Sequence, residues 1–157
     1  MTEYYNVINT LEEHLKNDIS VNTVTLGAIS NIDFDKQTVY PLSNIDVNKA
    51  TFEGNFMVFE VQVFCLDIVD TTKEDAHSLL KPIYGNNNLH DVYNTQLSVV
   101  NGLQSSLRRG ELNYELYEVG SLDVVEANQV SYQGVNLLAG WEVTLSIRVP
   151  NTEIQIC

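Results

Sequence analysis

Apolar residues recur at helical spacing in two parts of the chain. Within residues 4–15 they follow one another every three or four positions, with Thr2 as a plausible N-cap and Asn17-Asp18 as a stop. A second apolar stripe covers the region 89–107 and consists of Leu89, Tyr93, Leu97, Val100, Leu103 and Leu107. The two stripes predict a helix at the N-terminus and a longer helix in the centre of the chain.

Both ends of the central helix carry sequence signals. Asn88 followed by Asp91 resembles a capping arrangement at its start. Arg108-Arg109-Gly110 places two cations at the negative end of the helix dipole and then a residue that tolerates positive φ. These signals predict a helix over residues 89–109. A shorter helix is expected over residues 73–80.

The strongest strand signal lies in residues 56–69, where both alternating registers are largely apolar. Phe56, Val58, Phe64, Leu66 and Ile68 form one face, and Met57, Phe59, Val61, Val63 and Cys65 form the other. A strand that is apolar on both faces needs cover on both. One cover can be the chain's own helices, and the other can be a neighbouring subunit.

The last strand is expected over residues 141–149, where apolar and polar residues alternate as in an antiparallel sheet with one wet face. Weaker strand signals occupy residues 21–26, 38–42, 114–119 and 121–125, and Pro41 places the second of these at a sheet edge or ends it. The predicted fold class is α+β: a mainly antiparallel sheet with long strands, flanked by an N-terminal helix and a longer central helix.

Composition fits one domain over residues 1–157, with polar, glycine-bearing segments near 43–54 and 129–136 as candidate mobile arms. Eight Lys and Arg against 21 Asp and Glu give a net charge of −13. This balance disfavours binding to phosphate backbones and to membrane surfaces, both of which need basic patches. We find no membrane-spanning stretch and no signal peptide. Two cysteines indicate a reducing compartment without a disulfide framework.

No motif identifies an enzyme, so we predict no catalytic residue, no cofactor and no metal site. His14 lies among glutamates and is expected to be solvated, whereas His77 and His90 could converge with nearby carboxylates on a metal ion, without a recognised ligand spacing. Cys65 is expected to pack as a small apolar residue.

Acidic and aromatic residues offer two further candidate sites. Glu111, Glu115 and Glu118 could hold a carboxylate pair, but their spacing equally fits the solvated face of a hairpin, which we favour. Trp141 is predicted to be an aromatic anchor that opens a core strand behind the flexible Gly140, rather than a ligand-stacking residue.

Four segments of the chain carry a resemblance to a known group of proteins. They are residues 92–101 (VYNTQLSVVN), the helix end at 107–110, 138–141 (LAGW) and the ending 149–157 (VPNTEIQIC). Together they resemble small virion proteins of tailed phages, in particular those of crAss-like and related phages infecting Bacteroidota. The C-terminal half carries this resemblance. The N-terminal half is similar only in outline to tail-terminator and neck proteins, through a helix, an extended segment with Tyr40-Pro41-Leu42 and a long strand.

The resemblance implies a structural virion protein of the tail or neck, made in the host cytoplasm. Such a subunit forms a homo-oligomeric ring of six- or twelve-fold symmetry, contacts the neighbouring connector, portal and tail proteins, and lets genome DNA pass through its lumen without specific binding. The acidic balance fits a channel through which DNA slides, because like charges repel. Two alternatives remain: a small metal- or carboxylate-dependent enzyme, and a monomeric binding module.

Overall fold

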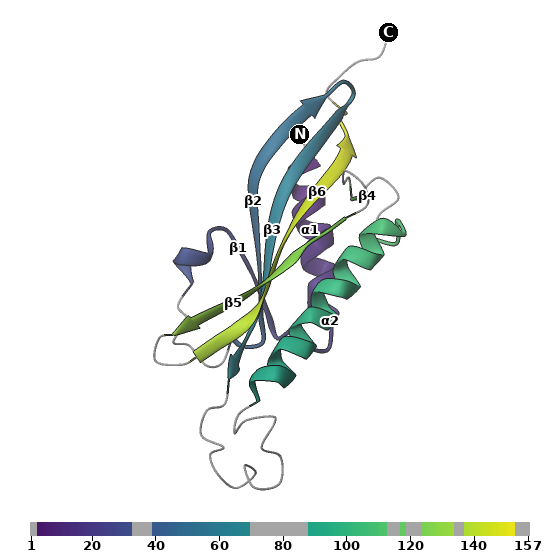
Figure 1. Cartoon of the computed structure of the whole chain (residues 1–157). Coiled ribbons are helices and arrows are strands. Elements are labelled where there is room, and N and C mark those ends of the chain that lie inside the picture. Colours follow the sequence, from purple (N-terminus) through teal and green to yellow (C-terminus); the bar gives the residue numbers. More distant parts are fainter. Residues whose placement is uncertain are drawn as a thin grey trace, which may run out of the picture.

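The computed structural model describes residues 3–32, 39–69, 88–112, 117–118, 124–133 and 137–152. Its elements are α1 (Glu3–Lys16), β1 (Thr23–Leu26), the 3₁₀ turn η1 (Ile29–Asn31), β2 (Leu42–Glu53), β3 (Phe56–Val69), α2 (Leu89–Arg108), β4 (Tyr117–Glu118), β5 (Ala127–Gln133) and β6 (Leu137–Pro150). The strands form one sheet and both helices lie on the same side of it (Figure 1). This confirms the predicted α+β class.

The sheet is built around the long antiparallel pair of β3 and β6. The two strands pair from Phe56↔Pro150 to Val69↔Leu137, over the whole of both elements. On one side β2 pairs antiparallel with β3, and the short β1 pairs parallel with the first four residues of β2. On the other side β4 and β5 both pair antiparallel with β6, at different heights. The strand order is therefore β1-β2-β3-β6, followed by β4 and β5 along one edge.

The main core lies between the helices and one face of this sheet. The odd-numbered residues of β3 and β6 point to this side, because side chains alternate along a strand. Its buried apolar residues come from both helices and from the central strands: Val7, Leu11, Leu15, Val99, Val100, Leu103, Leu107, Ile45, Met57, Phe59, Val61, Val63, Cys65, Val143, Leu145, Ile147 and Val149. Of the two apolar faces predicted for β3, the one with Met57, Phe59, Val61, Val63 and Cys65 therefore packs against the helices.

The second face of β3 is covered by the chain itself over the C-terminal half of the strand, which is the lower half in Figure 1. Leu66 and Ile68 lie beside a cluster formed by Tyr40, Leu42 and Leu138, to which Tyr132 adds. Toward the turn between β2 and β3, the described residues Phe56, Val58 and Glu60 on this face are half-buried. There Phe56 lies under the guanidinium of Arg148, whose Cζ is 5.0 Å from the ring centroid. A neighbouring subunit is therefore not needed to bury the lower half of the strand.

The prediction of a mobile arm at 43–54 is wrong, because this segment forms most of β2, a strand of 12 residues. The Gly54-Asn55 pair joins β2 to β3 as a two-residue turn, with Gly54 at φ 57°. Polar composition concealed this strand, because residues 48–53 are all exposed and need no apolar side chains. In the second expected arm, residues 129–133 belong to β5, and 134–136 lie outside the described residues.

Strand and helix ends differ from the predictions in four places. β6 begins at Leu137, four residues before the expected start, so Gly140 lies inside the strand rather than ahead of it. Residues 124–126 are not in a strand, and β5 begins at Ala127. The strand expected to end at Pro41 is wrong for the described residues 39–41, which precede β2, and β2 begins at Leu42. α2 ends at Arg108, followed by Gly110 at φ 70° as expected, but Asn88 makes no side-chain cap hydrogen bond.

Candidate functional surface

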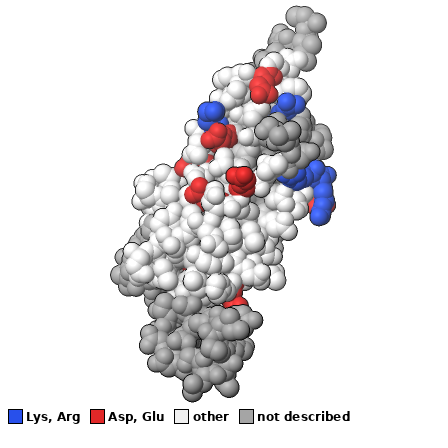
Figure 2. Space-filling view, in the orientation of Figure 1, with Lys and Arg blue, Asp and Glu red and all other residues white. Residues whose placement is uncertain are grey.

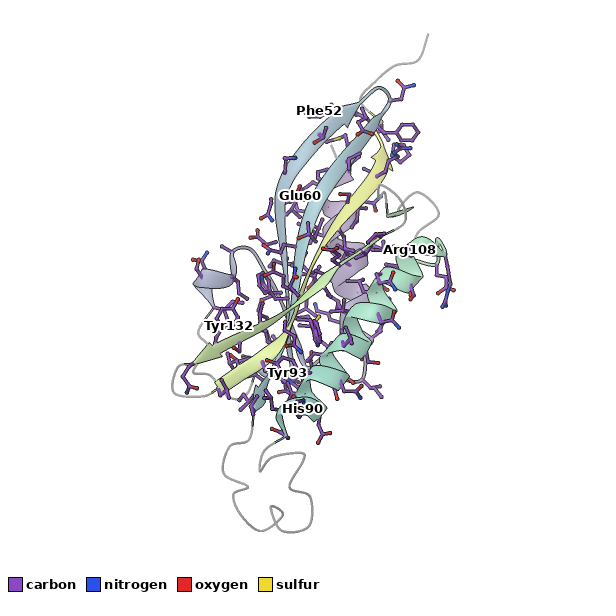
Figure 3. The ribbon with its side chains drawn as sticks, viewed as in Figure 1. Phe52, Glu60, His90, Tyr93, Arg108 and Tyr132 are labelled. Carbon is purple, nitrogen blue, oxygen red and sulfur yellow. The ribbon has the colours of Figure 1, made fainter. Side chains whose placement is uncertain are left out.

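The candidate metal ligands do not converge within the described residues. His90 and Asp91 are exposed in the first turn of α2 (Figure 3), and His14 lies on α1. His77, and the helix expected around it, lie outside the described residues. No group of three His, Cys, Asp or Glu side chains in the described ranges could hold a metal ion.

His14 is less solvated than its glutamate neighbours suggested. It is half-buried, and burial lowers the pKa of its imidazole below 6.5, because desolvation penalises the charged form. The negative charges of Asp18 and Glu111 act in the opposite direction and raise the pKa. The sequence placed His14 on a polar helix face, but it could not show that the segment after α2 returns beside that face.

Cys65 is a packing residue, as predicted. It is fully buried in the main core, and burial raises the pKa of its thiol to about 12. The Ser43 hydroxyl donates a hydrogen bond to the sulfur over 3.6 Å and partly opposes this increase. A thiol with so high a pKa is almost entirely protonated at neutral pH and is a poor nucleophile.

The described part of the proposed carboxylate cluster is a surface ion pair. Glu111 is exposed and lies 3.4 Å from the guanidinium of Arg109. Glu115 lies outside the described residues, as does the side chain of Glu118 in β4. The expected carboxylate pair therefore stays untested.

Trp141 anchors α2 to the sheet. Its indole Nε1–H donates to the backbone carbonyl of Tyr93 over 2.8 Å, and the two rings meet edge to face at 6.0 Å. The anchor role is confirmed, but the interpretation of Gly140 is wrong. A Cβ built on Gly140 would lie 1.8 Å from the carbonyl oxygen of Cys65, so the glycine permits close approach of two strands.

The upper half of β2 forms an open sheet edge. β1 accompanies β2 only over Leu42–Ile45, and no described strand pairs with the outer side of β2 beyond that point (Figure 1). Residues 48–53 are all exposed, and the Phe52 side chain, labelled near the tip of the hairpin in Figure 3, is 68% exposed. We call residues 49–53 (KATFE) the open edge.

Charged side chains of both signs surround the open edge. The Lys49 Nζ lies 3.7 Å from Oε2 of Glu60, and the Arg148 Nη2 lies 3.4 Å from Oε2 of Glu53. In Figure 2 acidic and basic side chains lie close together over the upper part of this view, whereas the lower described part is nearly free of charge. The view in Figure 2 is therefore of mixed charge and not uniformly acidic.

A groove of about 350 Å³ separates α2 from the start of β5. Its apolar lining residues include Leu97, Val100, Val124 and Val143. Asn101, Gln104 and Arg108 of α2 add polar and charged groups. Leu97 and Val124 are exposed. No histidine, cysteine or acidic residue is among its described lining residues.

Sequence reasoning missed the open edge, which is the most distinctive surface of the described chain. One signal could have found it: Gly54-Asn55 is a favoured two-residue hairpin turn, and Thr51 and Phe52 before it favour strands. Comparison with known proteins adds no relative, because no protein-family model and no curated protein sequence matches the chain. Neither described helix is both long enough and apolar enough to cross a membrane.

Proposed function

We propose that this protein is a structural subunit of a tailed-phage particle, tail-terminator-like, which forms a homo-oligomeric ring at the junction of head and tail. It acts by shape: each copy contacts two neighbours, and the closed ring joins the assemblies above and below it. Genome DNA passes through the lumen without being bound.

The observation that supports this proposal best is that the described sheet ends in an unpaired strand edge on both sides. β2 is open beyond Ile45, and β5 pairs with β6 on one side only. A closed ring needs two different surfaces on each copy, which meet head to tail. The strand directions are also compatible with such a contact. Because β5 runs opposite to β2, pairing of β5 with β2 of the next copy would continue the antiparallel pattern.

The charge balance supports the passage of DNA. A net charge of −13 repels phosphates, so DNA is not retained by counterion release. The resemblance in residues 92–101 and 149–157 supports the class of particle.

The decisive experiment is an image of the particle of the phage that encodes this chain. We expect mass spectrometry to find the chain in purified particles and a cryo-EM map to place it in a ring between head and tail. Absence of the chain from purified particles would refute the proposal. A second test mixes the purified protein with duplex DNA at low salt, where we expect no change in fluorescence anisotropy. Tight binding would contradict an inert lumen.

A further inference from the structure

We propose that the open edge of β2 pairs with the open edge of a second copy, so that the free chain is a two-fold symmetric dimer joined by one antiparallel strand pair. The inference goes beyond the ring and does not depend on a phage role. It follows from the register of β2, from the charges on residues 49–53 and from the exposure of Phe52.

The free backbone groups of the open edge allow only certain registers. In an antiparallel ladder, alternate residues direct both backbone groups to the same neighbour. Glu53 and Phe56 close the two-residue turn, so Glu53, Thr51 and Lys49 direct their backbone groups to β3. Ala50 and Phe52 then direct theirs outward. A second β2 can therefore pair only where an outward residue meets an outward residue.

One permitted register places Thr51 opposite Thr51 of the second copy. Ala50 then lies opposite Phe52 of the second copy, and Phe52 lies opposite its Ala50. These two pairs exchange their N–H and C=O groups, which gives four backbone hydrogen bonds across the two-fold axis. The small side chain of Ala50 leaves room for the exposed ring of Phe52, and both residues lie on the same face of the sheet as Met57 and Phe59.

The charges select this register over the adjacent ones. It places Lys49 opposite Glu53 of the second copy, and the symmetry produces this pair twice. Opposite charges directly across an antiparallel pair stabilise it, and like charges destabilise it. Moving the axis by two residues to Glu53 sets two acids opposite each other, and moving it by two residues to Lys49 sets two cations opposite each other. Axes at Phe52 or Ala50 leave the charges unmatched.

Lys49 and Glu53 lie on the same face of the sheet, and each already forms an ion pair within its own chain. Lys49 lies near Glu60, and Glu53 lies near Arg148, all on the face away from the helices. In the dimer these form two clusters of alternating sign, each containing four charges. Exposed ion pairs contribute little singly but more as a network.

A β-bulge and a lysine are common devices that protect an edge strand from pairing. Here the register shift lies between Val47 and Lys49, below the open edge, and residues 49–53 pair regularly with β3. The lysine meets an acid in the proposed register. The two devices therefore limit how far the pairing extends and which register it takes, rather than preventing it.

The dimer and the proposed ring use the same edge of β2, so one copy cannot make both contacts. The dimer is thus the state of the free chain, and ring assembly requires its dissociation. Loss of the dimer in the tests below would leave the ring proposal standing, because the ring is tested on particles.

The first test is a disulfide across the axis. Residues facing each other in a non-hydrogen-bonded antiparallel pair have Cα atoms about 4.5 Å apart, which a disulfide can span. In a Cys157→Ser background, Thr51→Cys is expected to form a covalent dimer under mild oxidation. Thr144→Cys is the matched control, because Thr144 is exposed on the same face, on β6. We expect it to stay monomeric on a non-reducing gel.

The second test reverses the charges. Lys49→Glu and Glu53→Lys each turn both cross-axis pairs into like charges, and each should weaken the dimer at least about tenfold in sedimentation velocity. Mixing the two single variants restores opposite charges in both pairs, so a mixed dimer should form where neither variant dimerises alone. This recovery also shows that both variants are folded.

The outcomes separate cleanly. A wild-type dimer, a covalent Thr51→Cys dimer and recovery on mixing support the proposal. A wild-type chain that is monomeric at about 0.5 mM overturns it, since that sets Kd in the millimolar range. A dimer that both single variants retain, or that Thr51→Cys fails to crosslink, also overturns it, because the contact then lies elsewhere.

Discussion

Gln96 is the clearest case in which one substitution should stabilise this fold. Its side chain lies on the buried face of α2 and is 0% exposed. Neither its amide nitrogen nor its amide oxygen has a hydrogen-bond partner among the described residues. A buried polar group without a partner costs about 1–3 kcal/mol. Methionine has a similar length and shape but no amide, so Gln96→Met should remove that cost without opening a cavity.

We expect Gln96→Met to raise the free energy of unfolding by about 1–3 kcal/mol. For a chain of this size that corresponds to an increase in Tm of about 2–4 °C per kcal/mol. Urea unfolding followed by circular dichroism measures the first quantity and a thermal scan the second. Gln104→Met is the matched control on the same helix, because the Gln104 amide donates to Asn101 and Ser105 and should not gain stability when lost. A Gln96→Met variant that is less stable than wild type, or unchanged, would refute the reasoning, since the amide would then have to be satisfied.

Three further predictions test other parts of the structure. Gly140→Ala should lower the free energy of unfolding by more than about 3 kcal/mol or prevent folding, because the added Cβ would collide with the Cys65 carbonyl. Gly102→Ala, within α2 where nothing lies near the added Cβ, should raise the free energy of unfolding by about 0.5–1 kcal/mol. Equal effects of the two variants in urea unfolding would contradict this. In a Cys157→Ser background Cys65 should not react with a thiol reagent at pH 8 until urea unfolds the chain, and rapid reaction of the native protein would show that burial does not protect it. The pKa of His14 is lower in the folded state than the unfolded value of 6.5, so the unfolded state takes up the proton first and stability falls as pH drops through about 6.5. His14→Gln should lose less stability than wild type between pH 7.5 and pH 5.5, and identical losses would exclude this contribution.

Periodicity predicted the elements that pack against each other but not every face. The β3 strand and both helices were predicted within one or two residues, because their apolar patterns are long. The expected stripe on α2 was partly wrong: Val92 and Gln96 are buried, whereas Leu97 is 39% exposed. A polar Gln96 could not be counted as apolar, so the predicted stripe turned away from the buried face over the first half of the helix.

The chemistry-bearing residues were harder to predict, because their environment depends on contacts distant in sequence. Burial in the folded chain lowers the pKa of His14, and the negative charge of Glu111, distant in sequence, opposes this effect. Gly140 shows the same limit: nothing in LAGW indicates that the Cys65 carbonyl occupies the space of a side chain. Only the register of β3 against β6, with Leu66 opposite Gly140, brings the two together.

The open edge depends on a difference in length that no local pattern encodes. β1 has four residues and β2 has 12, so the parallel pairing stops at Ile45 and leaves the rest of β2 unaccompanied. Once the open edge is known, the sequence indicates how it can pair. When two copies of KATFE are placed antiparallel, lysine lies opposite glutamate, alanine opposite phenylalanine and threonine opposite threonine. Such self-complementarity has no consequence in a strand paired on both sides, but on an exposed edge it specifies a partner, and that partner is another copy of the same chain.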